Sequence, residues 1–313
     1  MRKFKIEGVK PFKRFLFRTC YYHQLISALS CFDIDAEYIL VNAFTFIRDN
    51  FEYEDKDIYP EKELLEKLGC KIVKCRIDRR KLCKNIAAGH PVIVGVDCYY
   101  LESRADTYKY RHDPHYILAY GYDLDKDEVN VVDHDYVNDW AYKEKTISLG
   151  NLLLSDKMFS RGVNNKRHTC RIIEKRGLPV ITDIRQIWQN ISKSEIVASR
   201  EASKNNLAKL RKMFYDDTEA LKNNIKKIHE YWTSVNRFYK TLAALDMFES
   251  EEYSAIIHKL TAACDVLQSA IWKTNAKKIY TFTPEQTEKI GHKLSEIDEY
   301  EEKIYSIICR GEL

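Results

Sequence analysis

The order of hydrophobic and polar positions changes character near the middle of this chain. Before about Gly177 the pattern alternates between helical and strand periods, whereas after Pro179 apolar residues recur three and four positions apart almost throughout. This change predicts a domain boundary, with a first domain over residues 1–178 and an all-α helical bundle over residues 179–313.

The first half is predicted to begin with helices and to continue with strands. The predicted helices span residues 20–32, 38–49, 61–68 and 79–88. The predicted strands span residues 70–77, 91–97, 115–122, 128–133 and 167–174. The strand at 91–97 is strongly apolar, so we expect it to be central, and the next two form a hairpin. Helices followed by an antiparallel sheet indicate an α+β fold.

The second half contains four stretches with apolar residues at helical spacing. They begin near Ile184, Leu221, Tyr253 and Thr283, and the last has Thr283 as an N-cap and Pro284 at the first helical position. We expect these apolar stripes to form the core of the bundle.

Composition excludes some classes of protein. Of 313 residues, 51 are Lys or Arg and 47 are Asp or Glu, so the formal charge is only +4, which argues against a nucleic-acid partner. No segment approaches the roughly 18 apolar residues of a membrane helix, and no apolar signal segment follows the basic N-terminus, so we expect a cytoplasmic protein.

The nine cysteines are spread along the chain without close pairs, so we expect them to be reduced thiols. Lys and Arg are frequent in the first eighteen residues, which we expect to form a solvated basic arm.

Cys20 is the first candidate for chemistry. Thr19 before it is a natural N-cap, which would place the thiol in the first turn of a helix. A helix N-terminus and a neighbouring imidazolium can lower a cysteine pKa from about 8.5 to roughly 3.5–7.5. The alternative is a small buried residue like most of the other cysteines.

His115 and Asp133 extend this candidate site. His115 opens an apolar strand, and Asp133 ends the next one on the same face as Val129 and Val131. If the two strands pair, Asp133 can orient the His115 imidazole as a catalytic base requires. A register error of one residue would put His134 or Asp135 in that place.

A metal site is an alternative for the same segment. His112, His115, Asp133, His134 and Asp135 offer enough donors for zinc. However, His112 and His115 are separated by Asp113 and Pro114 and cannot share the face of a regular helix, and no HExxH motif is present. We therefore expect no metal and no cofactor.

The residues from 20 to 133 resemble the N-terminal domain family of butirosin biosynthesis protein H. The resemblance rests on CYYHQLISAL, PVIVGVDCYYL, HYILAYGYD and VNVVD, in this order. It implies a papain-like fold in which Cys20 attacks a thioester, His115 shuttles the proton and Asp133 orients His115. For the founding member the acyl donor is an acyl-carrier protein and the acceptor an aminoglycoside. Many relatives are encoded beside nonribosomal peptide machinery.

The sequence departs from the wider papain-like pattern at the oxyanion hole. Papain-like enzymes usually place a glutamine a few residues before the cysteine, and residues 1–19 contain neither Gln nor Asn. The backbone N–H of Cys20 is the default donor. Gln24 and Arg18 are the side-chain candidates, although Gln24 could equally be an ordinary helix residue.

Three functions follow from these observations. The leading hypothesis is a cysteine acyltransferase or thioesterase that takes an acyl or peptidyl group from a carrier protein in specialised-metabolite biosynthesis, with a small molecule, a peptide or water as acceptor. The second is a papain-like peptidase or amidase using the same residues. The third is a non-catalytic binding or scaffold protein that retains the fold.

Overall fold

The computed structural model describes residues 2–15, 17–136, 141–162, 169–245 and 251–310. The chain divides into two compact units. Unit 1 comprises Met1–Ile39 and Pro60–Thr182, and unit 2 comprises Leu40–Tyr59 and Asp183–Leu313. The predicted boundary at 178/179 lies close to Thr182, after which the chain passes from unit 1 to unit 2. The sequence did not predict that residues 40–59 fold with unit 2.

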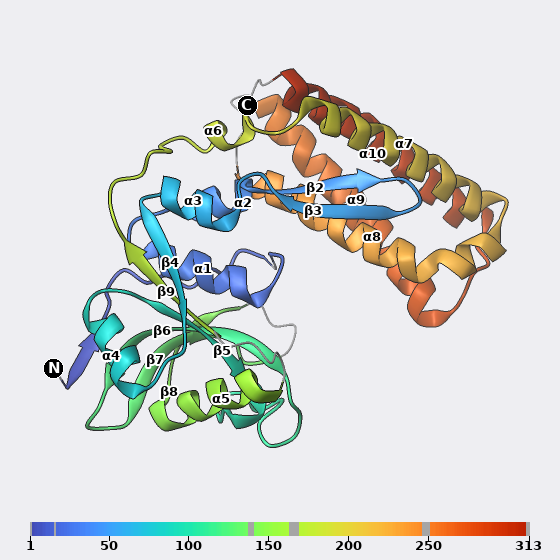
Figure 1. Ribbon diagram of the computed structural model, residues 1–313. Helices are drawn as coiled ribbons and strands as arrows, with labels where there is room; N and C mark the ends of the chain where they lie inside the picture. The colour runs from blue at the N-terminus through green and yellow to red at the C-terminus, as the bar shows by residue number, and fades with distance from the viewer. Residues whose placement is uncertain (1, 16, 137–140, 163–168, 246–250, 311–313) are drawn as a thin grey trace. The chain divides into compact units, whose positions relative to one another are not determined.

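Unit 1 is built on an antiparallel sheet (Figure 1). The strands are β1 (Lys3–Lys5), β4 (Cys70–Cys75), β5 (Val92–Asp97), β6 (Pro114–Asp123), β7 (Glu128–Asp133), β8 (Lys143–Ser148) and β9 (Cys170–Lys175). Their order is β4-β9-β5-β6-β7-β8, with β1 paired to the far end of β6. β5 is buried along its whole length between β9 and β6, which confirms its predicted central place.

Helices pack on this sheet. They are α1 (Cys20–Ser30), α3 (Glu61–Lys67), α4 (Arg79–Ala87) and α5 (Leu149–Gly162), together with the short η1 (Cys98–Tyr100); α2 (Glu37–Val41) leads into unit 2. α1 packs on β5 and β6, and α5 packs on β5, where Gly95 leaves room for the Phe159 ring. A Cβ at Gly95 would come within 2.6 Å of that ring, so a glycine is needed there.

Unit 2 is a helical bundle with a β-hairpin on it. The helices are α6 (Arg185–Trp188), α7 (Lys193–Tyr215), α8 (Thr218–Leu245), α9 (Glu251–Lys277) and α10 (Pro284–Arg310), and the hairpin is β2 (Ala43–Arg48) with β3 (Glu52–Asp57). α10 begins with a capping box in which Thr283 and Gln286 exchange side chain to backbone hydrogen bonds. The predicted α+β class and the helical second half are confirmed.

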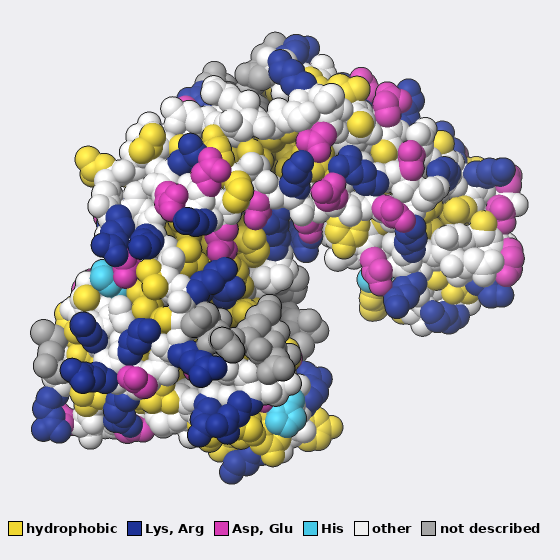
Figure 2. Space-filling model, in the orientation of Figure 1, with side chains coloured by type: hydrophobic (Ala, Val, Ile, Leu, Met, Phe, Trp, Pro, Cys, Tyr) yellow, Lys and Arg dark blue, Asp and Glu magenta, His cyan; other side chains and the backbone are white. Residues whose placement is uncertain are grey.

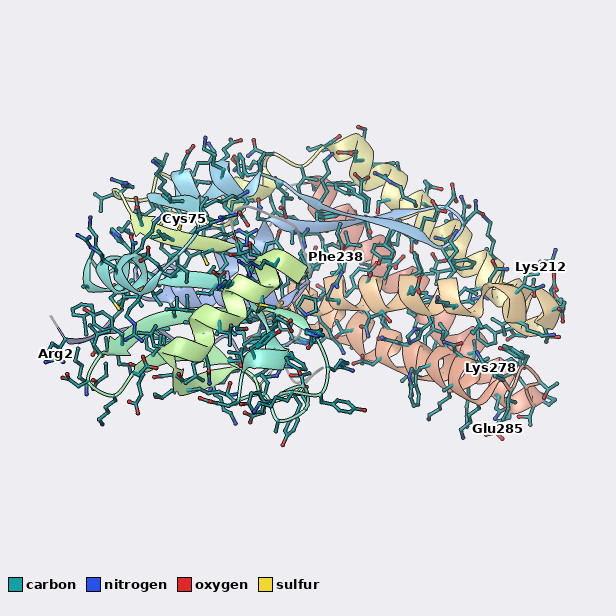
Figure 3. All side chains as sticks on the ribbon, turned by 60° about the horizontal axis from the view of Figure 1, so that its bottom comes forward. Arg2, Cys75, Lys212, Phe238, Lys278 and Glu285 are labelled. Carbon is teal, nitrogen blue, oxygen red and sulfur yellow. The ribbon has the colours of Figure 1, made fainter. Side chains whose placement is uncertain are left out.

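The predicted helix at 38–49 is wrong. The segment forms the end of α2 and then strand β2, whose Phe44, Phe46 and Ile47 are buried. Phe44 packs against Phe238 of α8, labelled in Figure 3, with ring centroids 4.7 Å apart. A short apolar run has no decisive period of its own, and the hairpin turn with positive φ at Asn50 and Phe51 settles the strand conformation.

Other expectations need smaller corrections. β1, β3, β8 and α5 were not predicted, and the first predicted helical stretch of the second half is divided into α6 and α7. None of the described helices is long and apolar enough to cross a membrane. All nine cysteines are free, and six of them are buried.

The basic N-terminal arm is less free than the charge run suggested. Arg2, Lys3, Lys5 and Arg14 each pair with a carboxylate of unit 1. On the face shown in Figure 2, Lys and Arg side chains are scattered among apolar and acidic ones. Much of the positive charge of the arm is therefore balanced within its own unit.

Candidate active site

Cys20 is the first residue of α1, as the sequence predicted. Thr19 is the N-cap and has extended backbone angles, although its side chain makes no capping hydrogen bond. The first N–H groups of a helix have no acceptor inside the helix and form the positive end of its dipole. The half-buried Cys20 thiol therefore lies where a helix stabilises an anion.

α1 reaches β6 because β6 extends beyond its neighbour β7. Pairing between these strands begins at Leu118 and Val132, so β7 offers no backbone partner to Tyr116 within the described residues. α1 fills this gap. Gln24 Nε2 donates a hydrogen bond of 3.1 Å to the Tyr116 carbonyl, and the Tyr116 N–H donates to the Cys20 sulfur. Cys20 and Gln24 are four residues apart and so lie on one face of the helix.

His115 and Asp133 lie at the ends of neighbouring strands and form a buried pair. His115 Nε2 is 3.0 Å from Asp133 Oδ1, and the two residues are 5% and 0% exposed. The Cys20 thiol forms a side-chain hydrogen bond with the same His115 ring. The three residues predicted from the sequence are thus joined in the order Cys20, His115, Asp133.

The charged forms of Cys20, His115 and Asp133 stabilise one another. Burial opposes a thiolate at Cys20, but the hydrogen bond and positive charge of His115 outweigh it and lower the pKa of Cys20 below its ordinary value. Burial likewise opposes an imidazolium, yet Asp133 and Cys20 raise the pKa of His115 to about 9. His115 in turn holds the pKa of the buried Asp133 below its ordinary value. The arrangement favours a thiolate–imidazolium pair at neutral pH.

A second layer of aromatic side chains surrounds His115. The His134 ring meets the His115 ring edge-on at 4.6 Å, and Tyr142 stacks on His23 at 4.5 Å and touches His134 at 4.9 Å. Burial lowers the pKa of both His23 and His134 to about 4, so these imidazoles are neutral at neutral pH. Neutral neighbours add no positive charge that would compete with the His115 imidazolium.

Neither His134 nor Asp135 occupies the orienting position. Asp135 is near the surface, where it pairs with Lys143 and Lys145. Lys145 also lies 3.8 Å from Asp133 Oδ2 and donates to the His134 carbonyl at 2.8 Å. The register of β6 and β7 thus selects Asp133 as the carboxylate that contacts His115.

The side-chain candidates for the oxyanion hole are placed differently from our expectation. Gln24 is 0% exposed and its Nε2 is used on the Tyr116 carbonyl, which makes it a link between α1 and β6. Arg18 adopts a left-handed backbone conformation, and its guanidinium lies over the Tyr22 ring and donates to the Tyr22 hydroxyl at 3.2 Å. The Cys20 backbone N–H, at the first helical position, is the donor best suited to an oxyanion.

The loop before His115 is held by a buried arginine. Arg104 is 0% exposed, contacts Asp106 and Asp113, and donates to Cys98 Sγ at 3.2 Å. At the loop's end His112 Nδ1 lies 2.6 Å from the buried Asp97 and its ring stacks on Tyr99. These contacts fix the segment that leads into β6 and His115.

Only three of the five residues proposed as metal ligands lie close together. Among the described residues, potential ligand atoms of His115, Asp133 and His134 lie within 4.8 Å of one another, whereas His112 and Asp135 have other partners. His115 already bonds to both Asp133 and Cys20. The geometry therefore suits a hydrogen-bonded triad better than a metal centre.

Comparison with known families gives an independent line of evidence. The sequence model of the butirosin biosynthesis protein H N-terminal family matches residues 46–134. The resemblance predicted from the sequence is confirmed over this segment, which includes His115 and Asp133 and begins after Cys20. No curated protein matches the chain.

The butirosin biosynthesis protein H family is linked to the production of an antibiotic. The match over residues 46–134 is consistent with a role in specialised-metabolite biosynthesis. Two parts of the site were not found by sequence reasoning, namely the Tyr116 N–H and the aromatic layer of His23, His134 and Tyr142. Backbone groups carry no sequence signal, and the aromatic residues are far apart in the chain.

Proposed function

We propose that the protein is a cysteine-dependent acyltransferase or thioesterase with a papain-like catalytic unit 1. One observation carries the proposal: Cys20, His115 and Asp133 are joined by hydrogen bonds, with pKa shifts that favour a thiolate beside an imidazolium. A structural cysteine in a core has no need of this arrangement, because burial alone raises its pKa, as it does for Cys31 and Cys70.

In the proposed reaction the Cys20 thiolate attacks the carbonyl carbon of a thioester. The tetrahedral oxyanion faces the N–H groups at the start of α1, including that of Cys20. As the carbon–sulfur bond to the leaving group breaks, His115 gives its proton to the departing thiolate. The product is an acyl-enzyme on Cys20 and a free thiol.

The second half of the reaction releases the acyl group. His115, now neutral, takes a proton from the incoming amine or water as it attacks the acyl-enzyme, and Cys20 leaves as the thiolate of the restored ion pair. Asp133 keeps the His115 ring in one orientation and stabilises its cationic form. An amine acceptor gives an amide and makes the protein a transferase, whereas water makes it a thioesterase.

The thioester donor that we propose is an acyl or peptidyl group on the phosphopantetheine arm of a carrier protein. The support is the family match, which links the segment to antibiotic biosynthesis, and the thioester itself, whose leaving thiol needs little acid assistance. The basic arm contributes less to this proposal than its composition suggested, since Arg2, Lys3, Lys5 and Arg14 are paired internally.

The test is intact-protein mass spectrometry after exposure to a panel of acyl-pantetheine thioesters. We expect a covalent acyl adduct on the natural protein, no adduct on Cys20→Ala, and a much slower one on His115→Ala. Faster turnover of a matched amide than of the thioester would replace the proposal with a peptidase or amidase. No adduct from any donor, together with an unreactive Cys20, would favour a binding protein.

A further inference from the structure

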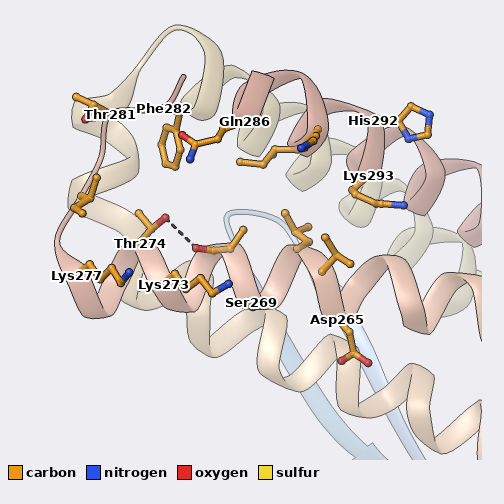
Figure 4. Close-up of a pocket in the computed structure, with 16 residues that line it drawn as sticks. Asp265, Ser269, Lys273, Thr274, Lys277, Thr281, Phe282, Gln286, His292 and Lys293 are labelled. Carbon is orange, nitrogen blue, oxygen red and sulfur yellow. Dashed lines mark hydrogen bonds between the residues drawn. The ribbon is translucent and has the colours of Figure 1, made fainter. Parts of the chain in front are cut away.

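A groove runs between α9 and α10 in unit 2 (Figure 4). Its volume is about 890 Å³, within the range of about 300–1,000 Å³ typical of small-molecule sites. The α9 wall carries Val266, Ala270, Lys273 and Lys277, whose spacings of four, three and four place them on one helix face. The groove is thus a continuous feature of one helix pair.

The floor of the groove is apolar, and its rim carries lysines and one carboxylate, Asp265, which pairs with Lys240 at 2.6 Å. Leu267 of α9 and Ile290 of α10 are buried beneath it, and Val266 at its edge is 53% exposed. Thr274, which also lines it, uses its hydroxyl on the Ala270 carbonyl of its own helix. The floor therefore offers little to a polar ligand and suits an apolar chain.

One end of the groove is closed by the connection between the two helices. Residues 278–283 link α9 to α10, and Ile279 and Phe282 of this connection line the groove. Phe282 is held by an edge contact with Phe214 of α7, with ring centroids 5.0 Å apart. Lys278 and Glu285 mark this end of the unit in Figure 3. A closed end admits a single chain more readily than a helix that must run through.

Positive charge is unbalanced near the closed end. On α10, Lys289 pairs with Glu285 at 2.7 Å and Lys293 pairs with Glu296 at 2.6 Å. Lys273 and Lys277 of α9 have no ion-pair partner among the residues that the structure describes. They lie one turn apart on the same wall (Figure 4). An anionic group between them would meet two cations with which no carboxylate in the described part of unit 2 pairs.

We propose that this groove binds a monomeric fatty-acid-like amphiphile. Its carboxylate lies at Lys273 and Lys277, and its hydrocarbon chain covers Val266, Ala270 and Ile290. The apolar floor supplies affinity in proportion to chain length, and the two lysines select an anionic head. The proposal concerns unit 2 alone and does not depend on chemistry at Cys20.

The test is calorimetric titration of the full chain with dodecanoate below its micelle concentration, beside dodecanol of the same chain length. We expect saturable binding of dodecanoate and clearly weaker binding of dodecanol. The double variant Lys273→Glu with Lys277→Glu should weaken dodecanoate binding about tenfold or more, because it replaces two attractive charges with repulsive ones. Ala270→Trp, which fills the groove, should abolish binding.

The matched control is the double variant Lys259→Glu with Lys212→Glu, whose lysines are exposed in unit 2 and lie outside the groove. It carries the same change in net charge and should bind dodecanoate as the natural protein does. Circular dichroism of each variant shows whether the bundle is intact.

Three results would overturn the proposal. The first is no saturable binding of dodecanoate, or equal weakening by the two double variants. The second is binding to phosphatidylglycerol vesicles that Lys273→Glu with Lys277→Glu abolishes, without any binding of monomeric dodecanoate, which would identify a membrane surface as the ligand. The third is a dimer in sedimentation that Ala270→Trp dissociates, which would identify a second copy as the occupant.

Discussion

Gln24 donates a hydrogen bond to the carbonyl of Tyr116, the residue that follows His115. One residue of β6, Tyr116, is thereby bonded to α1 through both of its backbone polar groups, since its carbonyl accepts from Gln24 and its N–H donates to Cys20. The helix that carries the thiol is thus fastened directly to the strand that carries the imidazole. We regard Gln24 as a positioning residue for this pair.

Replacing Gln24 with Leu should therefore affect both stability and reactivity. The part-buried Tyr116 carbonyl would lose its partner, at a cost of about 1–3 kcal/mol in the free energy of unfolding. The pH midpoint of Cys20 alkylation by iodoacetamide should rise as well, because the thiol and the imidazole lose their alignment. Gln189→Leu, at an exposed position in unit 2, is the control. A lower stability with an unchanged midpoint would reduce Gln24 to a purely structural role.

The pH dependence of Cys20 alkylation tests the ion pair itself. In the natural protein His115 lowers the pKa of Cys20, so alkylation should already be fast at pH 6. In His115→Ala the thiol loses both the hydrogen bond and the positive charge of His115. Burial, which raises the pKa of Cys20, is then opposed only by the backbone N–H groups of Tyr116 and Tyr21, and the rate at pH 6 should fall at least about tenfold.

Cys31 gives an internal control for that experiment. Burial raises its pKa to about 12, so its alkylation should stay slow until strongly alkaline pH in both proteins. Peptide mapping separates the two cysteines. Equal rates at Cys20 and Cys31 near neutral pH would contradict the assigned ion pair.

Acyl transfer should decline at alkaline pH. The step that expels the leaving thiol needs His115 in its protonated form, and the pKa of His115 is raised to about 9. Because this protonated form is present below that pKa and lost above it, the rate of acyl-enzyme formation should fall as the pH rises through about 9. A pH–rate profile of single-turnover acylation measures this. A rate that keeps rising to pH 10 would exclude His115 as the acid.

Asp133→Asn should leave Cys20 in place but impair His115 as its acid and base. The amide cannot stabilise the imidazolium and allows the wrong tautomer, so acylation should slow by about 100-fold or more. Asp125→Asn is the matched control, because Asp125 is exposed in the turn between β6 and β7 and its carboxylate pairs with Arg2, so the acylation rate should stay within about twofold of that of the natural protein. Equal effects of the two substitutions would show that Asp133 has no special role.

Unit 1 should not be separable from unit 2 by a single cut. A fragment ending at Thr182 retains β2 and β3 but lacks the helices on which Phe44, Phe46 and Ile47 are buried. We expect this fragment to aggregate, and the same fragment with residues 40–59 replaced by a Gly/Ser linker to stay monomeric. Size-exclusion chromatography and near-UV circular dichroism compare the two. A folded, monomeric first fragment would contradict the division into units.

The amino-acid sequence by itself determined much of this protein. The spacing of hydrophobic residues located most strands of the sheet and the long helices, because most of these elements bury one face. An uninterrupted apolar run located β5, which is buried on both faces. Thr19 and Thr283 placed two helix starts correctly, because capping is a local matter. Cys20, His115 and Asp133 were predicted from residue type and from the ends of elements.

Only the tertiary structure decided the rest. Residues 43–48 form a strand because α7 and α8, which lie far away in the sequence, bury both of its faces. Gln24 bonds to β6 because the strand register leaves the Tyr116 carbonyl without a partner on β7 among the described residues. The groove between α9 and α10 likewise depends on how these two helices pack against each other. Local sequence fixes local conformation, whereas pairing between distant segments is decided by the whole set of contacts that bury apolar surface and satisfy backbone polar groups.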